Sequence, residues 1–456
     1  MIISTTIDEP TQSLVISYYD STGNVAFIKK PLMESDLFNW VITQYPTEFR
    51  NWDGQSLKKS PSRRIHKFRF EELTQSKLSP TELSLIYSDY SPKKTYLDIE
   101  IQLTSNEFPE PELAKMPVNL ITIVNENNIC FVLSTMTNLD NTEVSNLTDE
   151  VNEYVKSKNQ QFTVKYIYFN DEVDMLSFFF HKMLPKIPFL TGWNVISFDW
   201  LYLINRCMRL GINPMLNMPS KQLIGSSKMP VHFGLLDYME VFQNTKPYKV
   251  VENYQLNYIA KLVLDLTKVP HEYNSMMEAQ ADSFNFIKYN IIDTVLIKLI
   301  EDELGLLDVA FAISKFAKID VSRVFGAVYI TETLMCREFL SRNRYVASDR
   351  KSPGEDATYA GAYVAEPIPG YYKNVACFDF ASMYPNIQIQ FNISPDAYLG
   401  KYEPEMVIPN DMILTKNDTL FSNKFDSAAR TILTGLYDGR VRTKKEMKKL
   451  EESLKK

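Results

Sequence analysis

The stretch TYLDIEIQL, residues 95–103, is the clearest indication of the structure in the middle of the chain. Apolar and polar residues alternate in it, which indicates a β-strand with one face against a core. Side chains two residues apart leave the same face of a strand, so Asp98 and Glu100 point the same way. Adjacent carboxylates repel unless a cation neutralises them, and divalent metals prefer oxygen ligands. For this pair alone, a solvated strand face is the alternative explanation.

Further strands and helices are predicted around this stretch. The segments NLITIV, ICFVLS and TVKYIYF follow as strands, and DEVDMLSFFFHKML has the pattern of a helix. FDWLYLINRCMRLGINP predicts a helix that stops at Gly211, and SFNFIKYNIIDTVLIKLIEDELG predicts a longer one that ends near Gly305. Upstream, residues 2–91 indicate a small mixed domain. Strands followed by amphipathic helices predict a mixed α/β layer.

Two later segments carry acidic residues of interest. In TGWNVISFDWLYL, residues 191–203, Asn194 and Asp199 bracket the entry into a helix, where an Asp can simply cap the helix end. In YNIIDTVLI, residues 289–297, Tyr289 and Asp293 are four residues apart and share one helical face. An Asp inside such an apolar helix needs a partner, because an unpaired buried carboxylate is costly.

The three segments together supply four carboxylates and one tyrosine, the set that two-metal phosphodiester hydrolysis requires. Two Mg²⁺ ions held by carboxylates align the attacking hydroxide with the leaving 3′ oxygen, and a tyrosine can orient the water. We expect Asp98 to bridge the two metals. Glu100, Asp199 and Asp293 then complete the metal shells, with Tyr289 beside them.

Composition sets broader limits. A chain of 456 residues with 45% hydrophobic content can bury several cores, so we expect more than one domain. The four cysteines lie far apart without a CxxC pair, which argues against zinc ligation and a disulfide framework. The net charge of −7 speaks weakly against a nucleic-acid partner, although basic patches such as Lys58-Lys59 and Arg63-Arg64 can still meet phosphates.

A further motif, FDFASMYPN, occupies residues 378–386. Asp379 stands at the end of the apolar run NVACFDF, which predicts a strand, where a metal ligand could sit. Ser382, Met383 and Tyr384 follow in a turn whose backbone amides could hold triphosphate oxygens. Taken alone, Asp379 is equally explained as the cap of a turn after a buried strand.

Read in order, YLDIEI, TGWNVISFDWLYL, YNIIDTVLI, TYAGAYV and DFASMYPN resemble the motifs of family B DNA polymerases with a DEDDy 3′–5′ exonuclease, especially those of T-even-type phages. The resemblance implies an α/β (mixed α+β multidomain) fold. Its parts are an N-terminal mixed domain, a ribonuclease H-like exonuclease domain and a partial polymerase palm with the start of the fingers. Three residues depart from the usual family motifs, namely Ala362 for glycine, Met383 for leucine and Asn386 for serine.

The resemblance also implies residue roles. Asp98, Glu100, Asp199, Tyr289 and Asp293 become the catalytic set of the exonuclease, whose four carboxylates hold two Mg²⁺ ions. Asp379 becomes a catalytic metal ligand of the polymerase site, which takes two Mg²⁺ ions when complete. The implied nucleotide-binding residues are Ser382, Met383, Tyr384, Arg440 and Lys444. The implied DNA contacts are Asn194, Tyr359 and Gly361.

Tyr384 would lie under the incoming sugar and exclude a ribose 2′-hydroxyl. Arg440 and Lys444, one turn apart in a basic C-terminal helix, could grip the β- and γ-phosphates. A solvated charged helix explains these two residues equally well. The predicted domains are 1–93 with 306–345 packing back on it, 94–305 as the exonuclease, 346–430 as partial palm and 431–456 as the first fingers helix.

No KxxxNSLYG-like or DTDS-like stretch occurs in the sequence, so the fingers lysine and the second palm aspartate are missing. We therefore expect DNA synthesis only with a C-terminal partner subunit, the chain being either half of a split polymerase or a truncation. The implied partners are primer–template DNA, a single-stranded 3′ end, dNTPs, and a sliding clamp with other replisome proteins.

Two other functions stay open, a stand-alone exonuclease and a nucleic-acid-binding translational repressor that uses SPSRRIHKFRF, residues 60–70. The sequence shows no secretory signal and no apolar run of about 18 residues. We expect no membrane association and a cytoplasmic location, in a phage-infected bacterial cell.

Overall fold

The structure, a computed structural model, describes residues 1–103, 108–266, 276–348 and 363–454. The chain divides into two compact units. The first comprises Met1–Leu32 and Lys77–Ile330, and the second comprises Met33–Ser76 and Thr331–Lys456. None of the helices in the described ranges is long and apolar enough to cross a membrane. The finer domain boundaries given above stay predictions.

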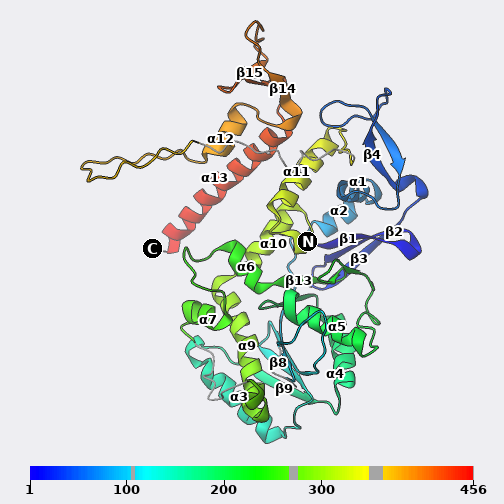
Figure 1. Ribbon diagram of the computed structural model, residues 1–456, viewed down its shortest axis with the longest axis vertical. Helices are drawn as coiled ribbons and strands as arrows, with labels where there is room; N and C mark the ends of the chain where they lie inside the picture. The colour runs from blue at the N-terminus through cyan, green and yellow to red at the C-terminus, as the bar shows by residue number, and fades with distance from the viewer. Residues whose placement is uncertain (104–107, 267–275, 349–362, 455–456) are drawn as a thin grey trace. The chain divides into compact units, whose positions relative to one another are not determined.

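A six-stranded mixed sheet forms the centre of the first unit, in the order β13-β10-β6-β7-β8-β9 (Figure 1). Strand β6 lies inside the sheet, parallel to β10 and antiparallel to β7. The strands are β6 (Lys94–Ile101), β7 (Val118–Asn125), β8 (Ile129–Ser134), β9 (Thr163–Tyr168), β10 (Phe189–Gly192) and β13 (Gly234–Asp237). The strands predicted from TYLDIEIQL, NLITIV, ICFVLS and TVKYIYF are thereby confirmed.

Helices cover both faces of this sheet (Figure 1). One apolar cluster joins Tyr96 and Leu120 of the sheet to α3 (Asn141–Tyr154), α7 (Leu256–Leu264) and α9 (Ser283–Leu304). A second cluster joins Leu97 and Ile99, on the opposite face of β6, to α4 (Glu172–Phe178) and α5 (Leu201–Arg209). Strand β6 is therefore covered on both faces, and the half-buried Asp98 and Glu100 follow the buried Tyr96 on one of them.

The predicted helices are found, with local irregularities. Helix α9 begins after Asp282, whose side chain accepts a hydrogen bond from the Asn285 amide, and it ends at Gly305 with φ of 61°. Helix α5 is preceded by a π-helical turn, η6 (Ile196–Trp200). Helix α4 continues through a π-turn and a short 3₁₀ turn, η4 (Phe179–Met183) and η5 (Leu184–Lys186). Such π-turns are frequent near functional sites.

A three-stranded antiparallel sheet of the N-terminal residues belongs to the same unit. It contains β1 (Ile2–Asp8), β2 (Ser13–Tyr19) and β3 (Val25–Pro31). The remaining elements of the unit are α2 (Pro80–Ile86), β11 (Leu223–Ile224), β12 (Met229–Pro230), α6 (Tyr238–Thr245), α8 (Met276–Ala281) and α10 (Leu306–Ala317).

The second unit contains a hairpin, a small sheet and several helices. The hairpin of β4 (Phe38–Ile42) and β5 (Leu57–Pro61) buries Trp40 and Leu57 against Tyr345. The small sheet has the order β14-β16-β15. Its strands are β14 (Tyr398–Lys401), β15 (Met412–Leu414) and β16 (Thr419–Ser422). The helices of this part of the chain are α1 (Lys67–Lys77), α11 (Ala327–Ser341), α12 (Met383–Gln390) and α13 (Ala428–Leu454).

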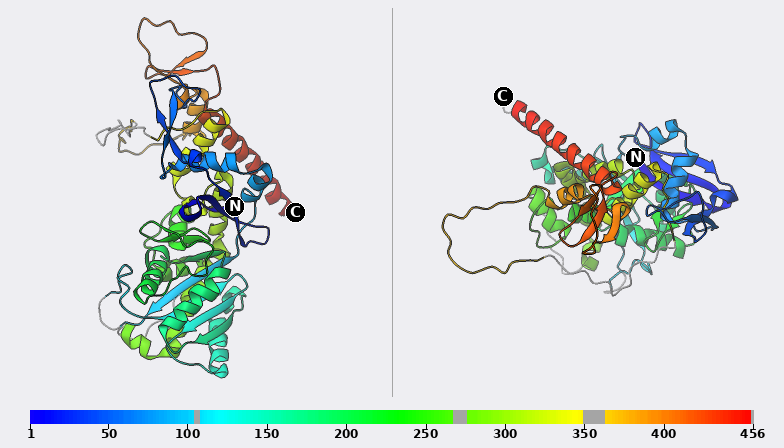
Figure 2. Two further views of the ribbon diagram at one scale, coloured as in Figure 1. Left: turned by 90° about the vertical axis from the view of Figure 1, so that its right-hand side faces the viewer. Right: turned by 90° about the horizontal axis from the view of Figure 1, so that it is seen from above.

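The strand predicted from NVACFDF is wrong for this structure, because residues 374–380 form no strand and pair with none within the described ranges. In Figures 1 and 2, the gold segment that leads into α12 extends away from the helices and strands of its own unit. Phe378 is 93% exposed, so no neighbouring backbone or core satisfies the apolar pattern. The strand-rich unit expected from Thr358 starts outside the described residues, and the strands that do form begin at Tyr398.

Candidate active sites

Strand β6 presents the first two predicted acidic residues. Asp98 faces Thr122 of β7 in the antiparallel register, and Glu100 faces Leu120. Both acidic residues are half-buried, while Leu97 and Ile99 between and beside them are buried on the other face. The alternation predicted from the sequence thus holds in the structure. Asp98 and Glu100 leave the side of the sheet on which α9 packs.

Asp199, in the π-turn η6, lies against the same strand. Its Oδ1 atom accepts a hydrogen bond of 3.1 Å from the backbone amide of Ile99, the residue that follows Asp98. The Asp199 side chain is only 4% exposed. The bond fixes a buried carboxylate beside β6, and it brings together two acidic residues that are 101 positions apart in the sequence.

Helix α9 supplies a third element. The amide of Asn290 donates a hydrogen bond of 2.6 Å to Oδ2 of Asp98, and its carbonyl accepts one from the Thr122 hydroxyl. Asp293 lies one turn further along and is 5% exposed, and Tyr289 is half-buried with its ring stacked on Phe286. The predicted residues of α9 therefore belong to a helix that reaches Asp98 through Asn290.

The electrostatics of Asp199 require a compensating positive charge or a proton. Burial, with a smaller contribution from the nearby charge of Asp237, raises the pKa of Asp199 to about 7, while the Ile99 amide opposes the shift. Burial likewise raises the pKa of Asp237, against four backbone amides that lower it. In the described ranges, neither aspartate forms an ion pair with Lys or Arg.

A buried carboxylate at the far end of α9 shows the contrasting arrangement. Glu301 is 2% exposed and accepts hydrogen bonds from Lys94 at 2.7 Å and from the Tyr238 hydroxyl at 3.0 Å. Burial raises the pKa of Glu301, and the Lys94 charge opposes that shift. Glu301 is thus neutralised within the protein, whereas in the described ranges Asp199 has only backbone amide donors, which is the condition in which a carboxylate can take up a metal ion.

The donor chemistry of Asp98, Glu100, Asp199 and Asp293 fits Mg²⁺, which prefers carboxylate oxygens. As the side chains stand, however, no group of three or more His, Cys, Asp or Glu residues in the described ranges is arranged to hold a metal ion. Metal binding by all four residues would therefore need side-chain movement. Their metal-binding roles stay predictions.

Two positioning residues were missed from the sequence. Asn290 holds Asp98, and Asp237 at the end of β13 accepts hydrogen bonds from the amides of Asn194 at 3.1 Å and Ile196 at 3.3 Å. Asn194 itself has a positive φ of 61°, so Asp237 stabilises a strained turn just before η6. The sequence offered two signals for these residues. Asp237 ends the apolar run GLL, and Asn290 is a polar residue next to Tyr289. Neither specifies a long-range partner.

The second candidate site lies around α12 in the second unit. Nη1 of Arg440, on α13, donates a hydrogen bond of 3.1 Å to the Ser382 hydroxyl, so two predicted nucleotide-binding residues lie together. Ser382 precedes α12 with φ of 52°, and Met383 and Tyr384 form the first turn of that helix. The free backbone amides of a first helical turn favour anions.

The remaining residues of this site are not brought together. Asp379 lies in the unpaired segment before α12 and is exposed, and Tyr384 is 72% exposed. Lys444 is exposed on α13, one turn beyond Arg440. The predicted DNA contacts Tyr359 and Gly361 lie outside the described residues.

The basic segment at residues 60–70 is partly used inside the second unit. Lys67 pairs with Glu332, and Arg69 is buried, pairs with Glu72 and donates to the Phe38 carbonyl. Arg63 and Arg64 are exposed. Half of the positive charge that could bind a nucleic acid is therefore already neutralised by the protein.

Comparison with known proteins agrees with this architecture. The sequence model described as DNA polymerase family B, exonuclease domain, matches residues 59–260, and the model described as DNA polymerase family B matches residues 325–456. The two matches together span most of the chain, and the chain belongs to DNA polymerase family B.

Individual relatives give the same result. The chain is 27% identical over 327 residues to the DNA-directed DNA polymerase of Escherichia phage RB69 and 25% identical over 329 residues to that of Enterobacteria phage T4. Each alignment covers 67% of this chain and 36% of the relative, so the chain spans about a third of these polymerases. The family B DNA polymerase of the archaeon Pyrobaculum calidifontis shares the fold, with a TM-score of 0.64 at 16% identity, over 98% of this chain and 64% of that one.

Proposed function

We propose that the chain is the N-terminal part, or one subunit, of a family B replicative DNA polymerase. In this proposal it removes nucleotides from the 3′ end of DNA by metal-dependent hydrolysis, and it synthesises DNA only when a C-terminal partner supplies the rest of fingers, palm and thumb. The observation that carries the proposal is the meeting of β6, η6 and α9, since Ile99 binds Asp199 and Asn290 binds Asp98.

Each residue of the exonuclease site has a proposed role. Asp98, Glu100, Asp199 and Asp293 hold two Mg²⁺ ions, which when bound supply Lewis acidity and an activated water. Asn290 keeps the Asp98 carboxylate in one orientation through its 2.6 Å hydrogen bond. Tyr289 orients the attacking water, and Asn194 contacts the DNA. The product is a nucleoside monophosphate together with a shortened 3′ end.

The C-terminal region supports the proposal that a partner completes the polymerase. Phe378 and Phe380, on either side of Asp379, are 93% and 80% exposed, and Tyr363 is 92% exposed. Exposed apolar surface of this extent is typical of an interaction surface. With Asp379 as its single acidic ligand, the polymerase site lacks half of the ligands for two Mg²⁺ ions, and the partner would bring the others. Ser382, Met383, Tyr384, Arg440 and Lys444 then bind the dNTP, and Tyr359 and Gly361 contact the template.

The proposed domains have the bounds predicted from the sequence. Residues 94–305 form the exonuclease domain, residues 346–430 the partial palm and residues 431–456 the first fingers helix. Residues 1–93, with 306–345, form the N-terminal domain. A sliding clamp and other replisome proteins are further proposed partners.

The exonuclease activity is tested with the purified chain and a 5′-labelled single-stranded DNA in Mg²⁺. We expect shortening from the 3′ end, no reaction in a chelator, and no reaction for the Asp98→Ala/Glu100→Ala double variant. The Asp149→Ala variant, at an exposed position of α3, is the matched control and should keep full activity. Full activity of the double variant would contradict the assignment.

The completion by a partner is tested with a labelled primer–template and dNTPs. We expect no extension by the chain alone and extension when the missing C-terminal polymerase portion, taken from a phage relative or from the neighbouring gene, is added. The Asp379→Ala variant should then abolish extension and keep degradation. If no such portion ever yields extension, the chain is better described as a stand-alone exonuclease.

The repressor function has less support. Lys67 and Arg69 are paired inside the second unit, and the Lys59 amine lies 4.8 Å from the centre of the Phe38 ring. Within residues 60–70, Arg63 and Arg64 are therefore the exposed cations that form no ion pair among the described residues. RNA binding that survives the Asp98→Ala/Glu100→Ala substitution and is lost on Arg63→Glu/Arg64→Glu would favour it instead.

A further inference from the structure

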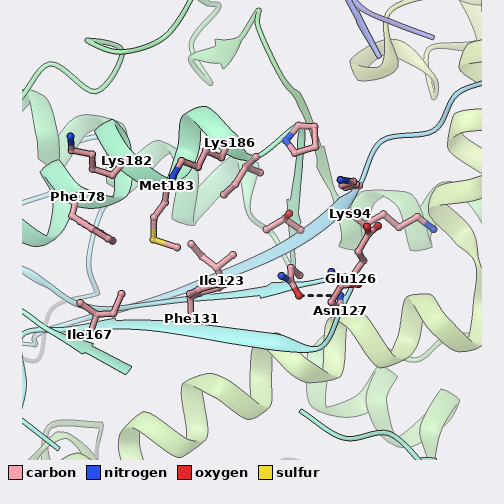
Figure 3. A pocket seen from close by; sticks show the side chains of 15 residues that line it. Lys94, Ile123, Glu126, Asn127, Phe131, Ile167, Phe178, Lys182, Met183 and Lys186 are labelled. Carbon is pink, nitrogen blue, oxygen red and sulfur yellow. Dashed lines mark hydrogen bonds between the residues drawn. The ribbon is translucent and has the colours of Figure 1, made fainter. Parts of the chain in front are cut away.

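A cavity of about 650 Å³ lies in the first unit, between the central sheet and the α4–η4–η5 run (Figure 3). Its lining includes Thr95 of β6 and Ile123 of β7. Leu97 and Ile99 alternate with Asp98 and Glu100 and belong to the apolar cluster on this side of the sheet. The cavity is therefore on the opposite face of β6 from the proposed exonuclease residues.

The walls of the cavity are large apolar side chains that remain partly exposed. Figure 3 shows Met183 reaching from the helical side, which also carries Phe178, toward the strands that carry Ile123, Phe131 and Ile167. The partly exposed apolar lining consists of Phe131, Ile167, Phe178, Met183 and Ile187. A cavity of this size and composition is typical of a site for a small organic molecule.

The rim of the cavity is positively charged. Lys93, Lys182 and Lys186 line it, and in the described ranges none of the three forms an ion pair. Lys94 is also present, but Glu301 at 2.7 Å and Asp308 at 2.8 Å neutralise it. The single carboxylate of the lining is Glu126. This local excess of positive charge lies on a chain whose net charge is −7.

We propose that this cavity binds an amphipathic organic anion, a molecule with an aliphatic or aromatic body and one anionic head. The body fills the space between Phe131, Ile167 and Met183, which offers apolar contacts and few hydrogen-bonding groups. The head lies at the rim near Lys182 and Lys186, which are four residues apart on the helical run and both exposed. A neutral apolar molecule would make only the contacts with the walls, and the positive charge of the rim would repel a cation.

Asn125 does not change this choice of ligand. Its side-chain oxygen already accepts hydrogen bonds of 3.0 Å from the amides of Asn127 and Ile129. A nucleobase would need several polar partners for its edge, whereas the space between Ile123, Phe131 and Met183 is bounded by apolar side chains. The ligand class therefore differs from the nucleotides of the proposed function, and the inference does not depend on that function.

The binding is tested by displacement of the fluorescent probe 1-anilinonaphthalene-8-sulfonate from the full chain, with all competitors below their micelle concentrations. We expect dodecanoate to compete, hexanoate to be at least about 100-fold weaker because it loses six methylene groups, and dodecyltrimethylammonium to be about tenfold weaker. Dodecanoate and the naphthalene probe represent the aliphatic and aromatic forms of the ligand.

Three variants locate the site. Lys182→Glu/Lys186→Glu should weaken dodecanoate about tenfold and strengthen dodecyltrimethylammonium, a reversal that a folding defect would not produce. Lys156→Glu/Lys158→Glu, at a turn outside the cavity, is the matched control and should change neither. Ile167→Trp should fill the cavity and abolish binding of both forms. Equal affinity of the wild-type chain for anion and cation, or unchanged binding by Ile167→Trp or by the Lys182/Lys186 variant, would overturn the proposal.

Discussion

Asp98 and Asp379 occupy similar sequence contexts, each between two large apolar residues, and the chain surrounds them very differently. The neighbours of Asp98, Leu97 and Ile99, are 0% and 5% exposed, because β6 lies inside a six-stranded sheet covered by helices. The neighbours of Asp379, Phe378 and Phe380, are 93% and 80% exposed. The same local pattern thus yields a buried strand in one region and an unpaired segment in the other.

The difference shows that an apolar strand pattern needs partners that the strand itself does not encode. Strand β6 finds β7 and β10 within the chain. Residues 374–380 find no strand among the described residues, although α12 and α13 beside them do form. Helices satisfy their backbone internally, whereas a strand needs a neighbour. A strand supplied by the partner proposed above would give residues 374–380 such a neighbour.

The largest expected effect is on 3′–5′ degradation, which should depend on Asp98 and not on Asp379. Asp98→Ala should reduce 3′–5′ degradation by the chain alone on the order of 10³-fold, equivalent to about 4 kcal/mol, because a metal ligand of the transition state is lost. Asp379→Ala should leave degradation unchanged, since the exposed segment takes no part in it. Rates of nucleotide release from single-stranded DNA measure both. A comparable loss in the two variants would show that the two sites depend on each other.

Sequence reasoning predicted the exonuclease region well for a physical reason. The strand at residues 95–103 and the helix around Asp293 both have long, regular patterns bounded by clear stop signals such as Gly305. Local pattern sufficed to predict these elements, and the order of the acidic motifs suggested that they meet. The contact between the Ile99 amide and Asp199 could not be derived, because nothing local relates two residues 100 positions apart.

The positions of Asn290 and Asp237 illustrate the same limit. Each looks ordinary in sequence, one as a polar residue in a helix and the other as a helix cap, yet each hydrogen-bonds a residue of the predicted site. In the C-terminal region the helix of Arg440 was predicted, and its bond to Ser382 was not. The strand from NVACFDF was wrong because its pattern requires a partner surface.

The same Phe→Ala substitution should affect stability very differently in the two regions. Phe180→Ala should lower the free energy of unfolding by about 3–5 kcal/mol, because Phe180 is fully buried beside Phe179 and Trp200 and leaves a cavity. Phe378→Ala should change it by less than about 0.5 kcal/mol, since the ring contacts little. Urea denaturation of the chain alone measures both values. Strong destabilisation by Phe378→Ala would mean that the segment packs on the folded chain.

Acid should weaken the first unit through one buried histidine. His232 is 4% exposed, neither of its ring nitrogens has a hydrogen-bond partner among the described residues, and burial lowers its pKa to about 4 from the ordinary 6.5. Between these values the unfolded chain binds a proton that the folded chain does not. Stability therefore falls as the pH drops from about 6.5 and levels off near 4, with a total loss of about 3 kcal/mol.

The His232→Asn variant isolates this contribution from the carboxylates that also titrate in acid. The difference in unfolding free energy between wild type and variant should change by about 3 kcal/mol from pH 7 to pH 4. His181→Asn, at a partly exposed ring, is the control. A difference that is constant with pH would show that His232 is protonated in the folded chain. The second unit contains His66, whose pKa burial also lowers, so the comparison with His232→Asn is what assigns the measured change to the first unit.

The smallest expected effect compares two helix starts. Asp140 caps α3, its side chain accepting from the amides of Thr142 at 2.7 Å and Glu143 at 2.9 Å, so Asp140→Ala should cost about 1 kcal/mol of unfolding free energy. Ser382 precedes α12 without such a capping bond, and its hydroxyl only accepts from exposed Arg440. Ser382→Ala should therefore change stability by a few tenths of a kcal/mol in the chain alone. If Ser382→Ala instead costs as much as Asp140→Ala, the start of α12 is already held by the chain, and a partner is not needed to order it.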